Sequence, residues 1–313
     1  MMKSVTLHNI TKTYGKEKML ALDAVSFDVE QGELFGLIGP DGAGKTSIFR
    51  ILTTLLLADS GTATVDGSDV IKDYKSIRSK VGYMPGRFSL YQDLTVEENL
   101  NFFASLFNTT IKENHELISE IYVQIEPFKT RRAGKLSGGM KQKLALCCAL
   151  IHKPVVLFLD EPTTGVDPVS RKEFWEMLKR LKQQGISIIV STPYMDEATL
   201  CDRIALIQKG RILSINTPEK IINAYPKSLY AIKSSSIYQL LKDLHTYENT
   251  LSCYAFGEFL HLTFKKESQN NVSEVKKFLK EKAHTDIEIK SIKPTVEDCF
   301  IQLMVSENPA TDE

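Results

Sequence analysis

Apolar and polar side chains alternate along the first 30 residues, which is typical of half-buried β-strands. The alternation predicts strands at Ser4–Ile10 and Met19–Val29, with a turn at Tyr14-Gly15 between them. Neighbouring strands joined by a short turn pair antiparallel. The chain is therefore expected to begin with an antiparallel sheet.

Three later segments are short and almost wholly apolar, as expected for strands that are buried on both faces of a parallel sheet. They are Leu34–Gly39, Val155–Leu159 and Ile186–Val190. Helical spacing follows the first of them over Thr46–Leu57, and a helix over Arg171–Gln184 separates the other two. Alternating strands and helices predict a parallel α/β core.

Between about Leu94 and Leu150 the pattern is helical. Thr95-Val96-Glu97-Glu98 has the residues of a capping box, and the apolar side chains that follow recur on one helix face. We interpret residues 87–150 as an α-helical subdomain inserted into the α/β core.

A different pattern begins after Tyr225-Pro226 and predicts a small C-terminal α+β domain. Its order of elements favours a ferredoxin-like module, and an α+β tail of another topology is the alternative. The segments are strand 228–233, helix 235–244, strands 252–256 and 259–264, helix 271–281 and strand 285–292. We expect one domain over 1–225, an accessory domain over 226–305 and a disordered tail over 306–313.

Composition narrows the classes of partner. The 313 residues carry 39 basic and 39 acidic side chains, so no overall charge favours nucleic acid. No secretory signal and no apolar segment of about 20 residues is visible, which predicts a soluble, cytoplasmic chain. The five cysteines have no metal-ligand spacing, so buried thiols in a reducing compartment are expected.

One glycine-rich segment matches the P-loop pattern G-x-x-x-x-G-K-T between a buried strand and a helix. In that pattern backbone N–H groups surround the phosphates of a nucleotide, lysine contacts the β and γ oxygens, and threonine binds Mg²⁺. The sequence therefore predicts an ATP site with Mg²⁺. The predicted residues are Gly39, Pro40, Asp41, Gly42, Ala43, Gly44, Lys45, Thr46 and Ser47.

Two carboxylates follow the apolar strand that ends at Leu159. Asp160 stands where it can bind Mg²⁺, and Glu161 stands where it can polarise an attacking water. An isolated Asp-Glu pair is usually a solvated loop. Beside a P-loop, and at the carboxyl end of a strand, the pair predicts ATP hydrolysis with Glu161 and Lys45 as catalytic residues.

The segment Leu136-Ser137-Gly138-Gly139 begins a helix with a capping serine and two glycines, a geometry that binds anions. With the P-loop, it resembles the LSGG signature of the ATP-binding subunits of ABC transporters, over residues 1 to about 225. The resemblance implies a head-to-tail dimer in which Ser137, Gly138 and Gly139 contact the ATP of the other subunit. It also implies that Tyr14 stacks on adenine and that Asp167 belongs to a loop crossing the dimer interface.

Two positions depart from the family pattern. Gly86 replaces a glutamine that contacts Mg²⁺ and the attacking water, and Pro193 replaces a switch histidine that contacts the γ-phosphate. Substitution by Arg87, Gln92 or a nearby residue is one explanation. The alternative, which we favour, is a degenerate site that binds ATP but hydrolyses it poorly, in a heterodimer with a different ATPase subunit; a homodimer is the other possibility.

Lys293–Ile301 resembles the closing helix of export ATPases of the ABC-2, multidrug type. The resemblance implies an exporter ATPase on the inner face of the plasma membrane, with separate permease subunits docking near Arg87–Tyr91. An ordinary packed loop is the other reading of that segment. A soluble ABC ATPase acting on ribosomes or DNA, and a regulatory subunit that never hydrolyses ATP, are the alternative functions.

Overall fold

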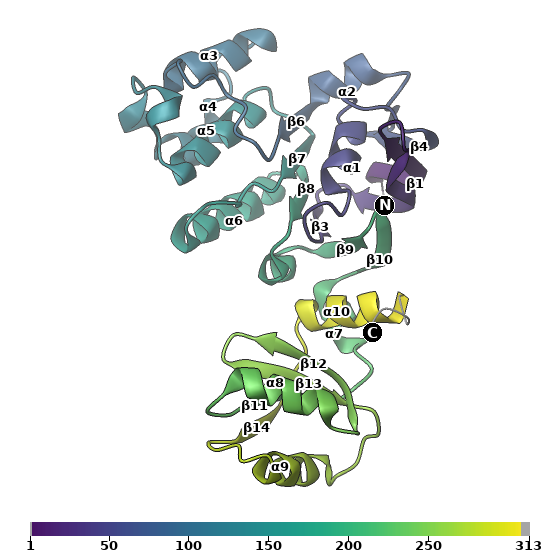
Figure 1. Ribbon diagram of the computed structural model, residues 1–313. Helices are drawn as coiled ribbons and strands as arrows, with labels where there is room; N and C mark the ends of the chain where they lie inside the picture. Colours follow the sequence, from purple (N-terminus) through teal and green to yellow (C-terminus); the bar gives the residue numbers. More distant parts are fainter. Residues whose placement is uncertain (1, 308–313) are drawn as a thin grey trace. The chain divides into compact units, whose positions relative to one another are not determined.

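A computed structural model describes residues 2–307 and divides the chain into two units (Figure 1). The first unit runs to Ile221 and resumes at Gln302, and the second spans Ile222–Ile301. The prediction of disorder is wrong at Ser306 and Glu307, which close the last helix, because helical hydrogen bonding continues past the expected end. The rest of the predicted tail, 308–313, lies outside the described residues.

The predicted antiparallel sheet at the beginning of the chain is confirmed. Its strand order is β2-β1-β4-β5, and every neighbouring pair is antiparallel. Alternate side chains of β1, such as Val5 and Leu7, are buried, which is the alternation visible in the sequence. The strands are β1 (Lys3–Tyr14), β2 (Met19–Glu30), β4 (Ser60–Val65) and β5 (Ser68–Asp69).

The predicted parallel core is also confirmed. A six-stranded sheet has the order β10-β9-β3-β8-β7-β6, in which only the edge strand β10 runs antiparallel to its neighbour. All residues of β3, β7 and β8 are buried, as their apolar sequences require. The strands are β3 (Leu34–Ile38), β6 (Val81–Met84), β7 (Val156–Asp160), β8 (Ser187–Thr192), β9 (Arg203–Gln208) and β10 (Arg211–Asn216).

Four α-helices accompany the two sheets of the first unit: α1 (Lys45–Leu52), α2 (Tyr74–Lys80), α6 (Pro168–Gln183) and α7 (Pro218–Asn223). The helix predicted to reach Leu57 ends at Leu52. Thr54 adopts a left-handed conformation with φ 63°, and the carbonyl of Arg50 accepts hydrogen bonds from the N–H groups of both Leu55 and Leu56. This closing turn uses the carbonyls that a longer helix would need.

The α-helical subdomain consists of α3 (Val96–Leu106), α4 (His115–Tyr122) and α5 (Gly138–Leu150), which form a group at one end of the first unit in Figure 1. The capping box is confirmed: Thr95 Oγ1 accepts from the N–H of Glu98, and Glu98 accepts from the N–H of Thr95. Two short 3-10 turns, Glu126–Phe128 and Ala133–Lys135, connect α4 to α5.

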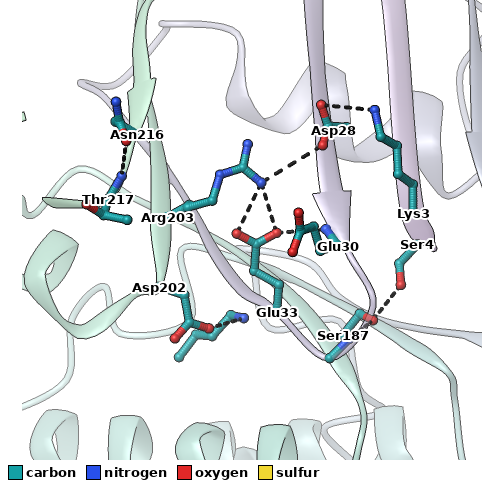
Figure 2. A network of polar contacts seen from close by, with 12 residues as sticks. Lys3, Ser4, Asp28, Glu30, Glu33, Ser187, Asp202, Arg203, Asn216 and Thr217 are labelled. Atoms are coloured by element: carbon teal, nitrogen blue, oxygen red, sulfur yellow. Dashed lines mark hydrogen bonds and ion pairs between the residues drawn. The ribbon is translucent and has the colours of Figure 1, made fainter. Parts of the chain in front are cut away.

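A polar network joins the antiparallel sheet to the central sheet (Figure 2). The hydroxyls of Ser4 on β1 and Ser187 on β8 are 2.6 Å apart. Arg203 on β9 lies 3.2 Å from Glu33 and 4.0 Å from Asp28 on β2. Burial raises the pKa of Glu33, and the Arg203 guanidinium offsets part of that rise.

The second unit has the predicted order of elements, β-α-β-β-α-β. Its four strands form one antiparallel sheet in the order β12-β13-β11-β14, with a buried core that includes Leu240, Leu262 and Val275. Its elements are β11 (Leu229–Lys233), α8 (Ile237–Thr246), β12 (Thr250–Phe256), β13 (Phe259–Phe264), α9 (Asn271–Glu281) and β14 (Glu288–Ile292), and α10 (Val296–Glu307) follows them.

Candidate functional site

The glycine-rich loop connects β3 to α1, at the carboxyl edge of the central sheet. Gly42 and Gly44 have φ angles of 77° and 108°, in a region that side chains with a Cβ disfavour. A Cβ on Gly39 would lie 2.2 Å from the carbonyl oxygen of Ile207. These three glycines are therefore required by the course of the backbone itself.

Lys45, the first residue of α1, turns back over this loop and is buried. Its Nζ donates to the carbonyl oxygens of Gly39, at 2.7 Å, and Pro40, at 2.9 Å. The same atom lies 3.1 Å from Oε1 of Glu161. The structure thus brings the two predicted catalytic residues into contact, although 116 positions separate them in the sequence.

The carboxylates stand where β7 ends, next to β8. Asp160 is buried, and the hydroxyl of Ser191 donates to its Oδ1 at 2.7 Å. The N–H of Glu161 donates to both the carbonyl oxygen of Ser191, at 3.1 Å, and its Oγ, at 3.0 Å. Glu161 has a φ of 50°, a conformation that costs a non-glycine residue about 1 kcal/mol or more.

Sequence reasoning missed Ser191. The apolar pattern predicts both strands, and neighbouring parallel strands place residues side by side, but the pattern does not say which strands are neighbours. Ser191 is the register partner of Asp160 in the β7–β8 pair. Only the order of strands in the sheet, which the sequence did not give, reveals that these two residues meet.

Thr46 and Asp160 provide a hydroxyl and a carboxylate oxygen, the kind of ligand that Mg²⁺ prefers beside nucleotide phosphates. No group of three or more His, Cys, Asp and Glu side chains within residues 2–307 is arranged to hold a metal ion. A single carboxylate with a hydroxyl fits Mg²⁺ that takes its remaining ligands from phosphate and water.

Tyr14 lies beside the P-loop helix. Its hydroxyl is 3.0 Å from Oγ of Ser47, and Lys12 lies over its ring at 6.0 Å. The position is next to the phosphate-binding loop, so an adenine-stacking role for Tyr14 stays a prediction. Ser47 also stands in α1, immediately after the predicted Mg²⁺ ligand Thr46.

The two departures from the family pattern lie against the same site. A Cβ on Gly86 would be 3.0 Å from the carbonyl oxygen of Asp160 and 3.9 Å from its Cγ. Pro193 follows Thr192, whose carbonyl oxygen accepts a hydrogen bond from Gly39 N at 3.3 Å. Gln92, one predicted substitute for the missing groups, has its carbonyl bonded to Gly134 N in the helical subdomain.

Glu197 organises the segment after Pro193 and was also missed by sequence reasoning. It is buried, and its carboxylate accepts hydrogen bonds from the hydroxyls of Thr192, at 2.5 Å, and Thr163, at 3.1 Å. Arg171 on α6 pairs with it at 3.0 Å and lies over the ring of Tyr194 at 4.2 Å. The network links the ends of β7 and β8 to α6.

The signature segment begins α5, with Ser137 as N-cap and its Oγ accepting from Met140 N at 3.4 Å. A Cβ on Gly138 would lie 3.5 Å from Gly165 O, and one on Gly139 would lie 2.9 Å from Ser170 Oγ. The structure therefore brings the signature beside the loop that precedes α6.

Asp167 caps α6, the helix-capping role that the sequence also allowed. Its Oδ1 accepts from the N–H groups of Ser170 and Val169, and these bonds lower its pKa. A contact between Asp167 and ATP on another subunit stays a prediction.

A groove of about 400 Å³ separates the helical subdomain from the central sheet. Leu55, Phe88, Leu106 and Phe107 are among its apolar walls, and His152 also lines it. Leu90, in the segment expected to receive a permease, is buried, whereas Tyr91 is exposed. That segment thus combines core packing with an open surface.

No helix within residues 2–307 has the length and apolar character needed to cross a membrane.

Comparisons with known proteins agree on one family. Residues 22–164 match the model described as ABC transporter. The chain is 37% identical over 317 residues to the "Probable multidrug ABC transporter ATP-binding protein YbhF" of Escherichia coli, covering 97% of this chain and 53% of that protein. It therefore spans about half the length of that relative.

The chain is also similar to a second relative and to a solved structure. The Nod factor export ATP-binding protein I of Burkholderia lata is 38% identical over 223 residues, covering 70% of this chain and 73% of that protein. A dimeric ATP-binding cassette in a post-hydrolysis state, bound to ADP and Pi, matches with a TM-score of 0.62 at 26% identity. That match covers 68% of this chain and 98% of the cassette.

Proposed function

This chain belongs to the ABC transporter ATP-binding proteins, and we propose that it is the ATPase subunit of an export complex. The observation that carries the proposal is the meeting of the P-loop with the carboxylates of β7, where Lys45 Nζ lies 3.1 Å from Glu161 Oε1. The names of the relatives, one linked to multidrug transport and one to Nod factor export, support export.

In the proposed reaction the P-loop binds the phosphates of ATP through its backbone N–H groups and Lys45. Thr46 and Asp160 would hold Mg²⁺, which neutralises phosphate charge when it is bound. Glu161 would orient the attacking water, and its ion pair with Lys45 holds the carboxylate close to the loop. Tyr14 would stack on adenine.

The signature would act on a second subunit. Ser137, Gly138, Gly139 and Asp167 lie together at the N-termini of α5 and α6, where backbone N–H groups attract anions. We propose that they contact the ATP held by the partner ATPase in a head-to-tail dimer. The dimeric form of the matched cassette supports a dimer, without deciding whether the two subunits are identical.

The groove supports a permease as the second partner. Its apolar walls include the exposed side chains of Leu55 and Leu106, and an amphipathic helix of a membrane subunit can bury its apolar face there. Docking at this groove would place the chain on the inner face of the plasma membrane. Movement of the helical subdomain would then couple ATP binding to the permease.

We further propose that this chain's own site is degenerate and that the natural dimer is a heterodimer. Gly86 lies against Asp160, and Pro193 follows a strand bonded to Gly39, so both absent side chains belong to this site. Loss of one or two groups that stabilise the transition state costs about 10² to 10³ in rate.

Turnover by the purified chain alone tests the degenerate site. We expect ATP binding with a hydrolysis rate well below one per second, rising when a partner ATPase with intact glutamine and histidine is added. Vigorous hydrolysis by the chain on its own would contradict the degenerate site and leave the family assignment intact. Failure to bind ATP at all would contradict the proposed function.

For the C-terminal part of the chain we propose a ferredoxin-like accessory domain over about 226–305, which follows an ATP-binding domain over 1–225 in the sequence. The element order and the antiparallel sheet β12-β13-β11-β14 support this proposal.

A further inference from the structure

Ser191 bridges the carboxylate of Asp160 and the backbone N–H of Glu161. It is fully buried on β8, opposite Asp160 in the parallel pair with β7. Its single hydroxyl makes two hydrogen bonds: it donates to Asp160 Oδ1 at 2.7 Å and accepts from Glu161 N at 3.0 Å. A hydroxyl can do both, whereas an apolar side chain of similar size can do neither.

The two bonds act on different parts of the site. The bond to Asp160 Oδ1 restricts the rotation of that carboxylate. The bond to Glu161 N, with a second from that N–H to the Ser191 carbonyl at 3.1 Å, holds the backbone of Glu161 at its unusual φ of 50°. The direction of the Glu161 side chain toward Lys45 depends on that backbone conformation.

We propose that Ser191 is a positioning residue for ATP hydrolysis, which sets the orientation of the Mg²⁺-binding and water-activating carboxylates together. The inference rests on the proposed function, because it assigns Asp160 and Glu161 the roles given there. Gly86 and Pro193 lack the polar side chains that the family pattern has at these positions. The orientation of the two carboxylates therefore depends more on Ser191.

A matched pair of serine variants tests the role. Ser191→Ala removes the hydroxyl at the site, while Ser187→Ala removes a hydroxyl from the same strand that is equally buried. Ser187 bonds to Ser4 Oγ at 2.6 Å, as Figure 2 shows, and accepts a hydrogen bond from Gly32 N at 2.9 Å. Ser191→Thr keeps a hydroxyl at the site and serves as the rescue variant.

Two measurements are made on each full-length variant. The first is ATP binding, titrated with Mg²⁺ and repeated in EDTA, which needs no hydrolysis. The second is the single-turnover rate with enzyme in excess, which resolves slow hydrolysis. Thermal unfolding midpoints show whether each variant is folded at the assay temperature.

For Ser191→Ala we expect the Mg²⁺ concentration at half-saturation to rise by about 10-fold or more and the single-turnover rate to fall by about 10-fold or more. This is the usual effect of removing a group that orients a ligand. ATP affinity in EDTA should stay within about twofold, because the P-loop is untouched. Ser187→Ala should match wild type in both site measurements. Ser191→Thr should restore most of the rate.

A merely structural role would lower the unfolding midpoint of both alanine variants and leave Mg²⁺ dependence equal in the two, which would overturn the inference. If wild type binds ATP but hydrolyses none, the Mg²⁺ titration decides the question. If wild type binds no ATP, the proposed function fails before the role of Ser191 is reached, so the two failures are distinct.

Discussion

The amine of buried Lys45 and the half-buried carboxylate of Glu161 form an ion pair of 3.1 Å across the P-loop. The lysine also donates to two loop carbonyls, so its three N–H donors all have partners within the protein. Phosphate oxygens would have to displace some of these partners. In the proposed reaction, ATP binding would therefore compete with the contact between Lys45 and Glu161.

Replacing Lys45 with alanine should weaken ATP binding. The lost charge-assisted contact is worth about 2 kcal/mol, which corresponds to about 30-fold in Kd. Equilibrium binding of a fluorescent ATP analogue measures the effect. Lys141→Ala, which removes a lysine from α5 near Phe88, is the control. Equal affinity of Lys45→Ala and wild type would exclude the assigned role.

The change Glu161→Gln should lower hydrolysis by about 10² to 10³ while ATP binding persists, because glutamine keeps the shape of the side chain but cannot accept a proton from water. Single-turnover hydrolysis and ATP affinity are measured together. In a mixture with the partner ATPase, total turnover reports whether this site contributes at all. An unchanged rate in the purified chain would show that another group activates the water.

The double change Gly86→Gln and Pro193→His, which introduces the glutamine and histidine of the family pattern, should increase hydrolysis by the chain alone by about 10-fold or more. The backbone at Gly86 can carry a side chain, but its Cβ would lie 3.0 Å from Asp160 O, so a shift of a few tenths of an ångström is required. Gly86→Ala is the control for that shift. Hydrolysis by the double variant at the wild-type level would contradict a degenerate site caused by these two positions.

A charge in the groove should weaken the permease contact. Leu106 is 62% exposed and lines the groove, whereas Val123 is 59% exposed and is not among the residues of the groove. Leu106→Asp should reduce co-purification with the membrane subunits by about 10-fold or more, because a carboxylate is costly to bury in an apolar contact. Val123→Asp should leave it unchanged. Equal effects of the two variants would argue against docking at the groove.

Stability of the first unit should depend on pH through His152. Burial lowers the pKa of this imidazole below its ordinary 6.5, although a bond to the carbonyl of Val81 partly offsets the effect. As the pH falls below 6.5, the unfolded chain takes up a proton before the folded chain does. The free energy of unfolding is therefore highest above pH 6.5 and falls as the pH is lowered from there toward the depressed pKa.

Urea unfolding at pH 7.5 and pH 5.5 measures this dependence. His152→Gln should reduce the difference between the two pH values, while His115→Gln, at an exposed position, should retain it. An unchanged difference in His152→Gln would assign the pH dependence to other groups.

The sequence by itself determined the elements and the chemistry of the phosphate-binding loop. The glycine positions from Gly39 to Gly44 and the apolar runs before Glu161 are local patterns, and local backbone preferences give them their structure. The capping box at Thr95 and the order of elements in the second unit were also readable, since each depends on a few neighbouring residues. The prediction that the helix after the P-loop continues to Leu57 was wrong, because the left-handed conformation of Thr54 has no reliable local signal in the sequence.

Only the tertiary structure decided which distant residues meet. Ser191 and Asp160 become neighbours through the pairing of β7 with β8. Glu197 contacts Thr163, Thr192 and Arg171, which come from three separate segments. Such contacts follow from the order and register of strands in the sheet, which depends on the packing of the whole core. The type of a side chain determines which hydrogen bonds it can donate or accept, and the fold determines which partner it meets.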